Sequence, residues 1–263
     1  MLRYRLILGL LVGSLFMELA CQKATTAPAV SGVASLTVVN AIPTSVPIIP
    51  VINTSGPIMY FGNAEQIGYG GDFEYSPVGG NDTIYVVQYN SDTLNLGPKA
   101  SGLLYYGILP LKMGGIYSLY LCGADTSSPD YLVTTDSLPY YSSSDSVMGV
   151  RFVNLSAGSN PISINLEGSA NGSEVGNLTY KGVTGFKQYP CNSTVGDYLF
   201  VIRDAATGDS LTQFDFGGHN NGYGLLDPTN GGTLLTFHNV TIAIYGSETN
   251  MNYPLNAMLI DDY

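Results

Sequence analysis

The sequence has no tryptophan, few basic residues and little charge of either sign. Nine lysines and arginines stand against 20 acidic residues, so the formal net charge is −11. Such a chain lacks the positive surface that binds a phosphate backbone, and we expect no nucleic acid partner. Only 11% of the residues are charged although 45% are hydrophobic. The polar surface must therefore come mostly from uncharged side chains.

Cysteine and histidine are scarce as well, with three Cys and two His. Neither His219 nor His238 has a second His or Cys at the spacing of metal ligands, and we expect no metal ion and no cofactor. No nucleophile elbow or similar signature surrounds a Ser, Cys or His. The sequence indicates a non-catalytic protein, with an enzyme of unknown class as the third-ranked alternative.

Long hydrophobic runs are missing too. The apolar run from Leu6 to Met17 is shorter than the ~20 residues that a membrane-spanning helix needs. Because Arg3 and Arg5 precede it, the run is typical of a secretory signal. Besides Cys21, the chain has only Cys122 and Cys191. An exported protein permits a disulfide between these two, and two unpaired thiols are the other interpretation.

The segment Glu18-Leu19-Ala20-Cys21 resembles the lipobox of bacterial lipoproteins, although Glu18 stands where the lipobox usually has Leu. The resemblance implies that residues 1–20 are a signal peptide and that Cys21 carries acyl chains. Residues 21–33 have no periodicity and predict a flexible tether. We expect an outer-membrane lipid anchor, facing either the cell surface or the periplasm. A secreted protein with an incidental Cys is the alternative.

From Ser35 onward, short β-branched and aromatic runs recur roughly every 8–12 residues between Gly, Pro, Asn and Asp clusters. This pattern predicts an all-β fold of two tandem antiparallel β-sandwich (Ig-like) domains, at 34–140 and 147–263. The proline-rich segment 42–57 is expected at a sheet edge or in coil. Gly68-Tyr69-Gly70-Gly71 predicts a hairpin turn. The expected strands are 36–40, 58–61, 83–89, 103–109, 116–122, 150–154, 162–166, 198–203, 211–216, 234–237 and 240–245.

Two copies of one pattern support the division into two units. Leu36–Asn40 and Val150–Asn154 are β-branched strands that end in Asn, and each is followed by a small-residue turn and an apolar strand near a Pro. Strands 116–122 and 240–245 both follow a Gly-Gly turn and close on Gly123 and Gly246. The middles of the two units align poorly in sequence.

The opening of the second copy, Arg151-Phe152-Val153-Asn154 followed by Pro161-Ile162, resembles the bacterial domain of unknown function 4397. The first copy is similar but has Thr37 in place of the Arg. The resemblance implies tandem β-sandwich domains on exported proteins, often lipoproteins of Bacteroidetes-type bacteria. It brings no catalytic residue.

Five Asp-Ser/Thr-aliphatic triplets resemble the O-glycosylation acceptors of exported proteins in those bacteria. The alternative is that these triplets are turns that precede strands. The resemblance implies modification at Thr83, Thr93, Ser137, Ser146 and Ser210.

Twenty tyrosines are the remaining chemical signal. Tyr140, Tyr141, Tyr105 and Tyr106 could stack on sugar rings, since tyrosine offers an apolar face and a hydroxyl group. Adjacent residues of a strand point to opposite faces, so only one of each strand pair can serve one surface. We expect a binding module for a glycan or for a partner protein of the cell envelope. A structural or adhesive envelope component is the alternative.

Overall fold

The computed structural model describes residues 32–52, 64–89, 102–142, 144–192, 198–216 and 235–262. All regular secondary structure in these residues is β, which confirms the predicted fold class. None of them forms a helix with the length and hydropathy to span a bilayer. Val33–Tyr263 clusters as one compact unit, so the domain boundaries 34–140 and 147–263 stay a prediction. The signal peptide, Cys21 and most of the tether lie outside the described residues.

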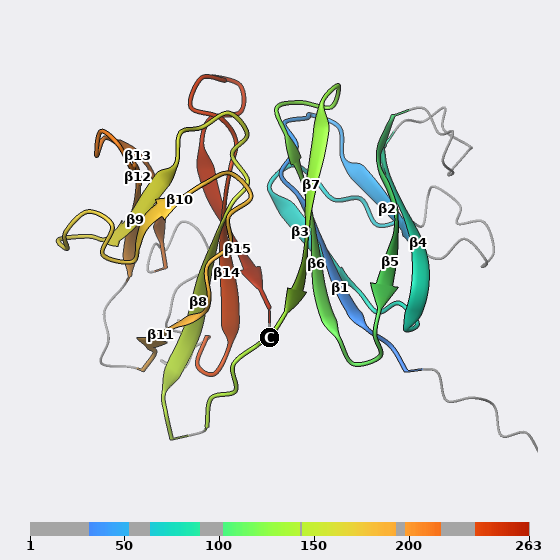
Figure 1. Ribbon diagram of the computed structural model, residues 1–263, viewed down its shortest axis with the longest axis horizontal. Coiled ribbons are helices and arrows are strands. Elements are labelled where there is room, and N and C mark those ends of the chain that lie inside the picture. Colours follow the sequence, from blue (N-terminus) through green and yellow to red (C-terminus); the bar gives the residue numbers. More distant parts are fainter. Residues whose placement is uncertain are drawn as a thin grey trace, which may run out of the picture. The chain divides into compact units, whose positions relative to one another are not determined.

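The strands form four sheets, two from each half of the sequence (Figure 1). The first half builds a first inner sheet, ordered β3-β1-β6-β7, and a first outer sheet, ordered β2-β4-β5. Their bounds are β1 Ser35–Asn40, β2 Ile48–Ile52, β3 Gly71–Tyr75, β4 Gly80–Gln88, β5 Leu103–Leu111, β6 Ile116–Gly123 and β7 Pro129–Asp136.

The second half builds a second inner sheet, ordered β11-β8-β14-β15, and a second outer sheet, ordered β10-β9-β12-β13. The bounds are β8 Val147–Asn154, β9 Ile162–Leu166, β10 Val175–Leu178, β11 Lys187–Pro190, β12 Leu199–Asp204, β13 Ser210–Asp215, β14 Asn239–Tyr245 and β15 Asn256–Asp261.

Each half has a hydrophobic core between its inner and its outer sheet. In the first half Leu36 and Leu119 of the inner sheet share a cluster with Ile84 of the outer sheet. In the second half Ile242 shares one with Phe200. The central strands β1, β6, β8 and β14 are buried along almost their whole length. Their continuous apolar runs are those of strands that are covered on both faces.

The start of the sequence repeat has the same structure in both halves. β1 pairs in parallel with β6, and β8 pairs in parallel with β14, so the inner sheets are mixed and not purely antiparallel as predicted. The strand-ending Asn40 and Asn154 donate their side-chain amides to the carbonyls of Ile67 and Leu178, each at 3.0 Å. Each also accepts the backbone N–H two residues later. The shared Asn therefore fixes the end of the strand.

The turn at Gly68–Gly71 corrects the predicted hairpin. Ile67 bridges to Ile48 of the first outer sheet, whereas Gly71 opens β3 of the first inner sheet. The turn thus carries the chain from one sheet to the other. The second half repeats it with Lys181 at φ 60° where the first half has Gly70 at φ 73°, and both N–H groups donate to the carbonyl of the strand-ending Asn. This turn is alike in the two units, although the middles of the units align poorly in sequence.

The two inner sheets face each other through a third hydrophobic cluster. Val39 and Tyr120 of the first half are buried there with Val153, Ala243 and Ile260 of the second. This cluster explains why the inner strands are apolar on both faces, because one face meets the outer sheet of its own half and the other meets the opposite half. We call this contact the joint.

Equivalent residues meet across the joint. The ring of Tyr69 lies edge-on to that of Tyr245, with centroids 5.0 Å apart. Tyr180, the equivalent of Tyr69 in the second half, donates its hydroxyl to the sulfur of Cys122 at 3.1 Å. Cys122 and Tyr245 are themselves equivalent, each lying one residue before the Gly that closes β6 or β14. The halves therefore contact each other through the same surface.

A buried charge cluster lies in the joint. The Arg151 guanidinium donates to Asp136 at 2.5 Å, to Asp262 at 3.2 Å and to the Thr241 hydroxyl at 2.6 Å. Ser118 donates to Asp136, and Thr241 donates to Asp262. Asp136 belongs to the first half and Asp262 to the second, and strand registers make the two equivalent. One cation therefore serves two carboxylates, and Arg151 of the second half pairs with an aspartate of each half.

Candidate functional site

The tyrosine pairs predicted to stack on ligands are each divided between the interior and the surface. Tyr106 is 52% exposed and stacks on Tyr85, whereas Tyr105 is buried in the first core and contacts Tyr131 edge-on. Tyr140 is 90% exposed, whereas Tyr141 is buried against Gly149. Of these four tyrosines, only Tyr106 and Tyr140 present a ring to solvent. Stacking on a ligand stays a prediction for these two.

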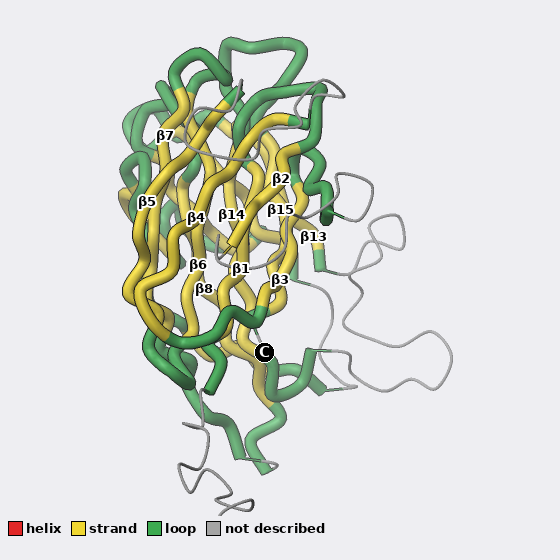
Figure 2. The backbone as a smooth tube through the Cα atoms, turned by 90° about the vertical axis from the view of Figure 1, so that its right-hand side faces the viewer, coloured by secondary structure: helices red, strands yellow, loops and turns green. Residues whose placement is uncertain are grey.

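The surface around Tyr106 is the edge of a sheet. β5 is an edge strand of the first outer sheet, and Figure 2 shows it beside β7 of the inner sheet. Ile108, two residues beyond Tyr106, is 60% exposed on the same face of β5. This face has an aromatic ring and an aliphatic side chain but no charged neighbour among its cross-strand partners, Tyr85 and Thr83.

The proposed glycosylation acceptors have different environments. Ser137 and Ser210 are exposed, and Thr83 and Ser146 are partly buried. The Asp that precedes Ser137 is Asp136 of the buried charge cluster, so that carboxylate is already bound within the protein. Thr93 lies outside the described residues. Glycosylation at these positions stays a prediction.

The cysteines and the described histidine do not converge. Cys122 lies in the joint and Cys191 in the second core, and no disulfide connects them. Burial raises the pKa of Cys122 to about 11, which makes it an inert thiol at neutral pH. His238 pairs with Asp261 at 3.0 Å on the surface, and His219 lies outside the described residues. Within the described ranges no three His, Cys, Asp or Glu side chains gather as metal ligands.

The pocket of interest is one that the sequence did not single out. It is an open cavity of about 390 Å³ at one end of the second outer sheet. Strand pairing assembles it, because Leu199 at the start of β12 lies opposite Asp215 at the end of β13, and its carbonyl accepts the backbone N–H of Glu167 just after β9. The lining residues are Leu166, Glu167, Ser169, Tyr198, Leu199 and Asp215.

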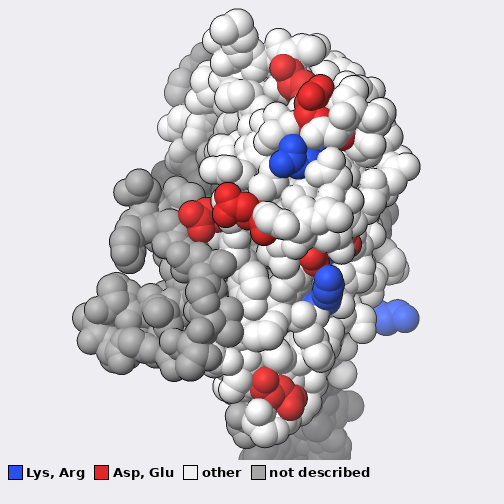
Figure 3. Space-filling view, turned by 90° about the vertical axis from the view of Figure 1, so that its left-hand side faces the viewer, with Lys and Arg blue, Asp and Glu red and all other residues white. Residues whose placement is uncertain are grey.

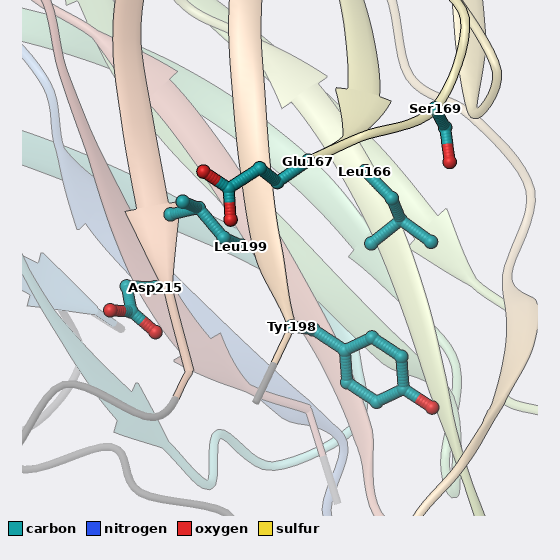
Figure 4. Close-up of a pocket in the computed structure, with 6 residues that line it drawn as sticks. All are labelled: Leu166, Glu167, Ser169, Tyr198, Leu199 and Asp215. Carbon is teal, nitrogen blue, oxygen red and sulfur yellow. The ribbon is translucent and has the colours of Figure 1, made fainter. Parts of the chain in front are cut away.

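The lining combines an aromatic ring, hydroxyl groups and carboxylates (Figure 4). In this view Leu199 lies between the carboxylates of Glu167 and Asp215, and Leu166 lies between Tyr198 and Ser169. Strand pairing places Leu166 on the core side with Phe200 and Leu199 on the outer side with Asp215, so the cavity spans the end of the sheet.

Tyr198 is held in place by its neighbours. Its hydroxyl donates to the carbonyl of Pro190 at 2.8 Å, and its ring packs against Phe200 and Tyr189. Burial, followed by the nearby Cys191, raises the pKa of the Tyr198 phenol, so the group is neutral at physiological pH. The ring is a fixed apolar surface, because its partners are core residues.

The surface around the pocket is sparsely charged. On the side of the second half that Figure 3 shows, small groups of acidic side chains and a few basic side chains are separated by uncharged surface. Glu167 and Asp215 are therefore a local concentration of negative charge. They can accept hydrogen bonds from hydroxyl or ammonium groups, and they disfavour phosphate or carboxylate ligands.

No sequence signal marks this pocket, because its residues lie at the ends of three separate strands. Glu167 and Asp215 are single acidic residues, and Tyr198 is one of many tyrosines. The available signal is the position of these residues: each lies within three residues of the end or the beginning of an expected strand. Only the order β9-β12-β13 brings these positions together.

Comparisons with known proteins add little. No family model and no curated protein matches the chain. Among solved structures, a family 26 carbohydrate-binding module from Eubacterium rectale Amy13K, crystallised with maltoheptaose, matches at 9% identity and a TM-score of 0.26, covering 87% of this chain and 97% of that one. The tip fimbrial protein Mfa3 from Porphyromonas gingivalis matches at 9% identity and a TM-score of 0.23, covering 88% of this chain and 99% of that one. Likenesses of this size carry no argument about function.

Proposed function

We propose that the chain is a non-catalytic binding protein of the cell envelope, anchored by lipid at Cys21, and that it binds a neutral glycan in the Tyr198 pocket. The observation that carries the glycan is the composition of the pocket lining, which includes a fixed tyrosine ring, two leucines, two carboxylates and a serine hydroxyl. Sugars present an apolar ring face and several hydroxyl donors, and this lining offers a partner to each.

The charge of the pocket narrows the ligand class. Two carboxylates line the cavity, and among the described residues that line it none is basic. A uronic acid or a phosphorylated sugar would meet repulsion there, whereas a hydroxyl group donates to a carboxylate in a charge-assisted hydrogen bond. We therefore propose a neutral oligosaccharide.

The binding test uses the soluble fragment that starts at Gln22, on a glycan array and then by calorimetry with the best neutral oligosaccharide. Glu167→Ala should weaken binding by about tenfold or more, since a hydrogen bond to a charged group is worth about 1.5–3 kcal/mol. Tyr198→Ala should weaken it further. Glu65→Ala removes an exposed carboxylate in the first half and serves as the matched control.

A third variant separates this pocket from the stacking site predicted at the sequence level. Tyr140→Ala removes a ring that is 90% exposed and is not part of the pocket lining. Loss of binding in Tyr140→Ala with full binding in Glu167→Ala would move the site to the segment between β7 and β8. Absence of binding across the array would contradict the glycan proposal as a whole.

The edge strand β5 supports a second candidate, a structural or adhesive component. Its nine residues lie at the edge of a sheet and expose Tyr106 and Ile108. Such an edge can accept a strand from another chain. Ile108→Lys would block that pairing, so a concentration-dependent assembly that this variant abolishes would favour the second candidate.

The lipid anchor has its own test. In bacteria that process lipoproteins, Cys21→Ser should abolish acyl labelling and release the protein from the membrane fraction. Unchanged membrane association of the variant would contradict the anchor, without bearing on the pocket.

A further inference from the structure

The described chain begins at one end of the fold, and several other segments share that end. Val33 bridges to Val78 in the turn between β3 and β4, and its carbonyl accepts the N–H of Gly114 in the turn between β5 and β6. The segment from β7 to β8 and the start of β14 also lie there, because Asp136 pairs with Ile116 at the start of β6. We call this the tether-proximal end.

Exposed apolar side chains concentrate at this end. Five of the ten large hydrophobic residues that the described part of the chain leaves exposed are found there. In the first half they are Val33 at 53%, Val78 at 47% and Met113 at 67%. Their backbones are joined by the bridge and hydrogen bond just described, so they form one group.

The other two lie beside the start of the second half. Tyr140 is 90% exposed, and Phe237 is 40% exposed in a turn where its φ is 70°. The backbone N–H of Phe237 donates to Val147 at 2.8 Å, and the Asn239 side chain donates to the carbonyl next to Tyr140 at 3.0 Å. Both rings therefore lie where β8 and β14 begin.

The opposite end differs. The turn between β14 and β15 exposes Met251 at 95%, but no second large hydrophobic residue of that turn is exposed to a comparable degree. Charged groups do occur at the tether-proximal end, namely Lys112, Asp145 and the His238–Asp261 pair. They include both signs, which suits a zwitterionic surface better than an anionic one.

We infer that the tether-proximal end rests on a lipid surface, with the side chains of Val33, Val78 and Met113 in the headgroup layer. This rests on the proposed lipid at Cys21. Eleven tether residues, Gln22 to Gly32, reach at most roughly 35–40 Å, which places this end within reach of the bilayer. Lipid is the occupant because the covalent chain leads from this patch to the acylation site, and exposed apolar and aromatic residues suit the interface.

The experiment compares two methionines on the full lipidated chain. Met113→Cys and Met251→Cys each receive an environment-sensitive fluorophore, while Cys122 and Cys191 are too buried to be labelled. The protein is reconstituted in vesicles of phosphatidylcholine and phosphatidylethanolamine that contain a quencher on the acyl chain. We expect the fluorophore at 113 to shift to the blue and to be quenched roughly twofold or more relative to that at 251.

The outcomes separate this inference from the anchor. A chain that fails to float with the vesicles overturns the anchor and this inference together. The inference alone is overturned if the chain floats with the vesicles but the fluorophore at 113 keeps the emission of a water-exposed probe. Equal quenching of both fluorophores would overturn it as well. A blue shift at 113 that appears without vesicles and grows with protein concentration would assign the end to a second copy of the chain.

Discussion

Arg151 is the residue whose replacement we expect to cost the most stability. Arg151→Met leaves Asp136 and Asp262 buried without a cation, and loss of one partner of a buried ion pair costs about 3–5 kcal/mol. Urea unfolding would measure the loss, with Lys112→Met as an exposed control. Adding Asp136→Asn and Asp262→Asn should recover much of it. Equal midpoints for Arg151→Met and the control would contradict the assigned role.

The raised pKa of Asp262 predicts that the stability of the folded chain depends on pH. Burial is the main cause that raises its pKa to about 6, although Arg151 opposes the shift. Because the pKa is higher in the folded than in the unfolded chain, the folded form takes up this proton first as the pH falls. The Asp262 contribution to stability therefore increases from pH 7 to pH 4, by up to roughly 3 kcal/mol.

Asp262→Asn isolates that contribution from the other carboxylates. The unfolding free energy of the native chain, minus that of the variant, should rise as the pH is lowered through 6 and level off near pH 4. A difference that stays constant, or falls with pH, would show that Asp262 ionises normally in the folded chain.

At the scale of elements, the glycines that close β6 and β14 should be equally intolerant of substitution. Gly123 has φ 121° and Gly246 has φ 91°, and an added Cβ would lie 2.5 Å from the Ser128 carbonyl or 2.3 Å from the Pro254 carbonyl. Each Gly→Ala change should cost roughly 2–4 kcal/mol, from backbone strain and overpacking together.

Gly176→Ala is the control for these two substitutions, since Gly176 lies in β10 with nothing within 4 Å of an added Cβ. Its effect should stay within about 0.5 kcal/mol. Thermal or urea unfolding of the three variants would measure these losses of stability. A large cost at Gly123 and none at Gly246 would argue that the two strand ends are not equivalent.

The strands that the sequence predicts are those with strong apolar runs. The strands β1, β4, β5, β6, β8, β9, β12, β13 and β14 overlap expected ranges, and β2 lies at an edge as the prolines suggested. The strands β3, β7, β10, β11 and β15 were missed. They are edge strands with mixed polarity, such as Gly71–Tyr75 and Lys187–Pro190, and one paired side leaves little hydrophobic signal.

The expected strand 234–237 was wrong because of one backbone conformation, and the pocket was missed because it depends on the pairing order of the strands. Residues 235–237 form a turn, because Phe237 adopts a left-handed φ of 70° that no strand permits. The expected strand 58–61 lies outside the described residues. The pocket depends on the order β9-β12-β13, and a pairing order is not encoded in any single segment.

For the whole molecule we expect one unfolding transition, although the sequence predicts two domains. The halves share a buried cluster and an ion pair, so opening one exposes apolar surface on the other. Calorimetry should give a van't Hoff enthalpy equal to the calorimetric one. In Arg151→Met we expect the transition to broaden or divide. Two resolved transitions in the native chain would contradict this expectation.

The joint also has the form of a dimer interface within one chain. Equivalent strands face each other, and the Tyr69–Tyr245 contact has its equivalent in the Tyr180–Cys122 contact, as in an isologous contact between identical subunits. The copies differ at the position of the buried cation, where the first has Thr37 and the second has Arg151. Two copies of the first half placed together would bury two aspartates with no cation, so that half is suited to pair with its diverged copy and not with itself.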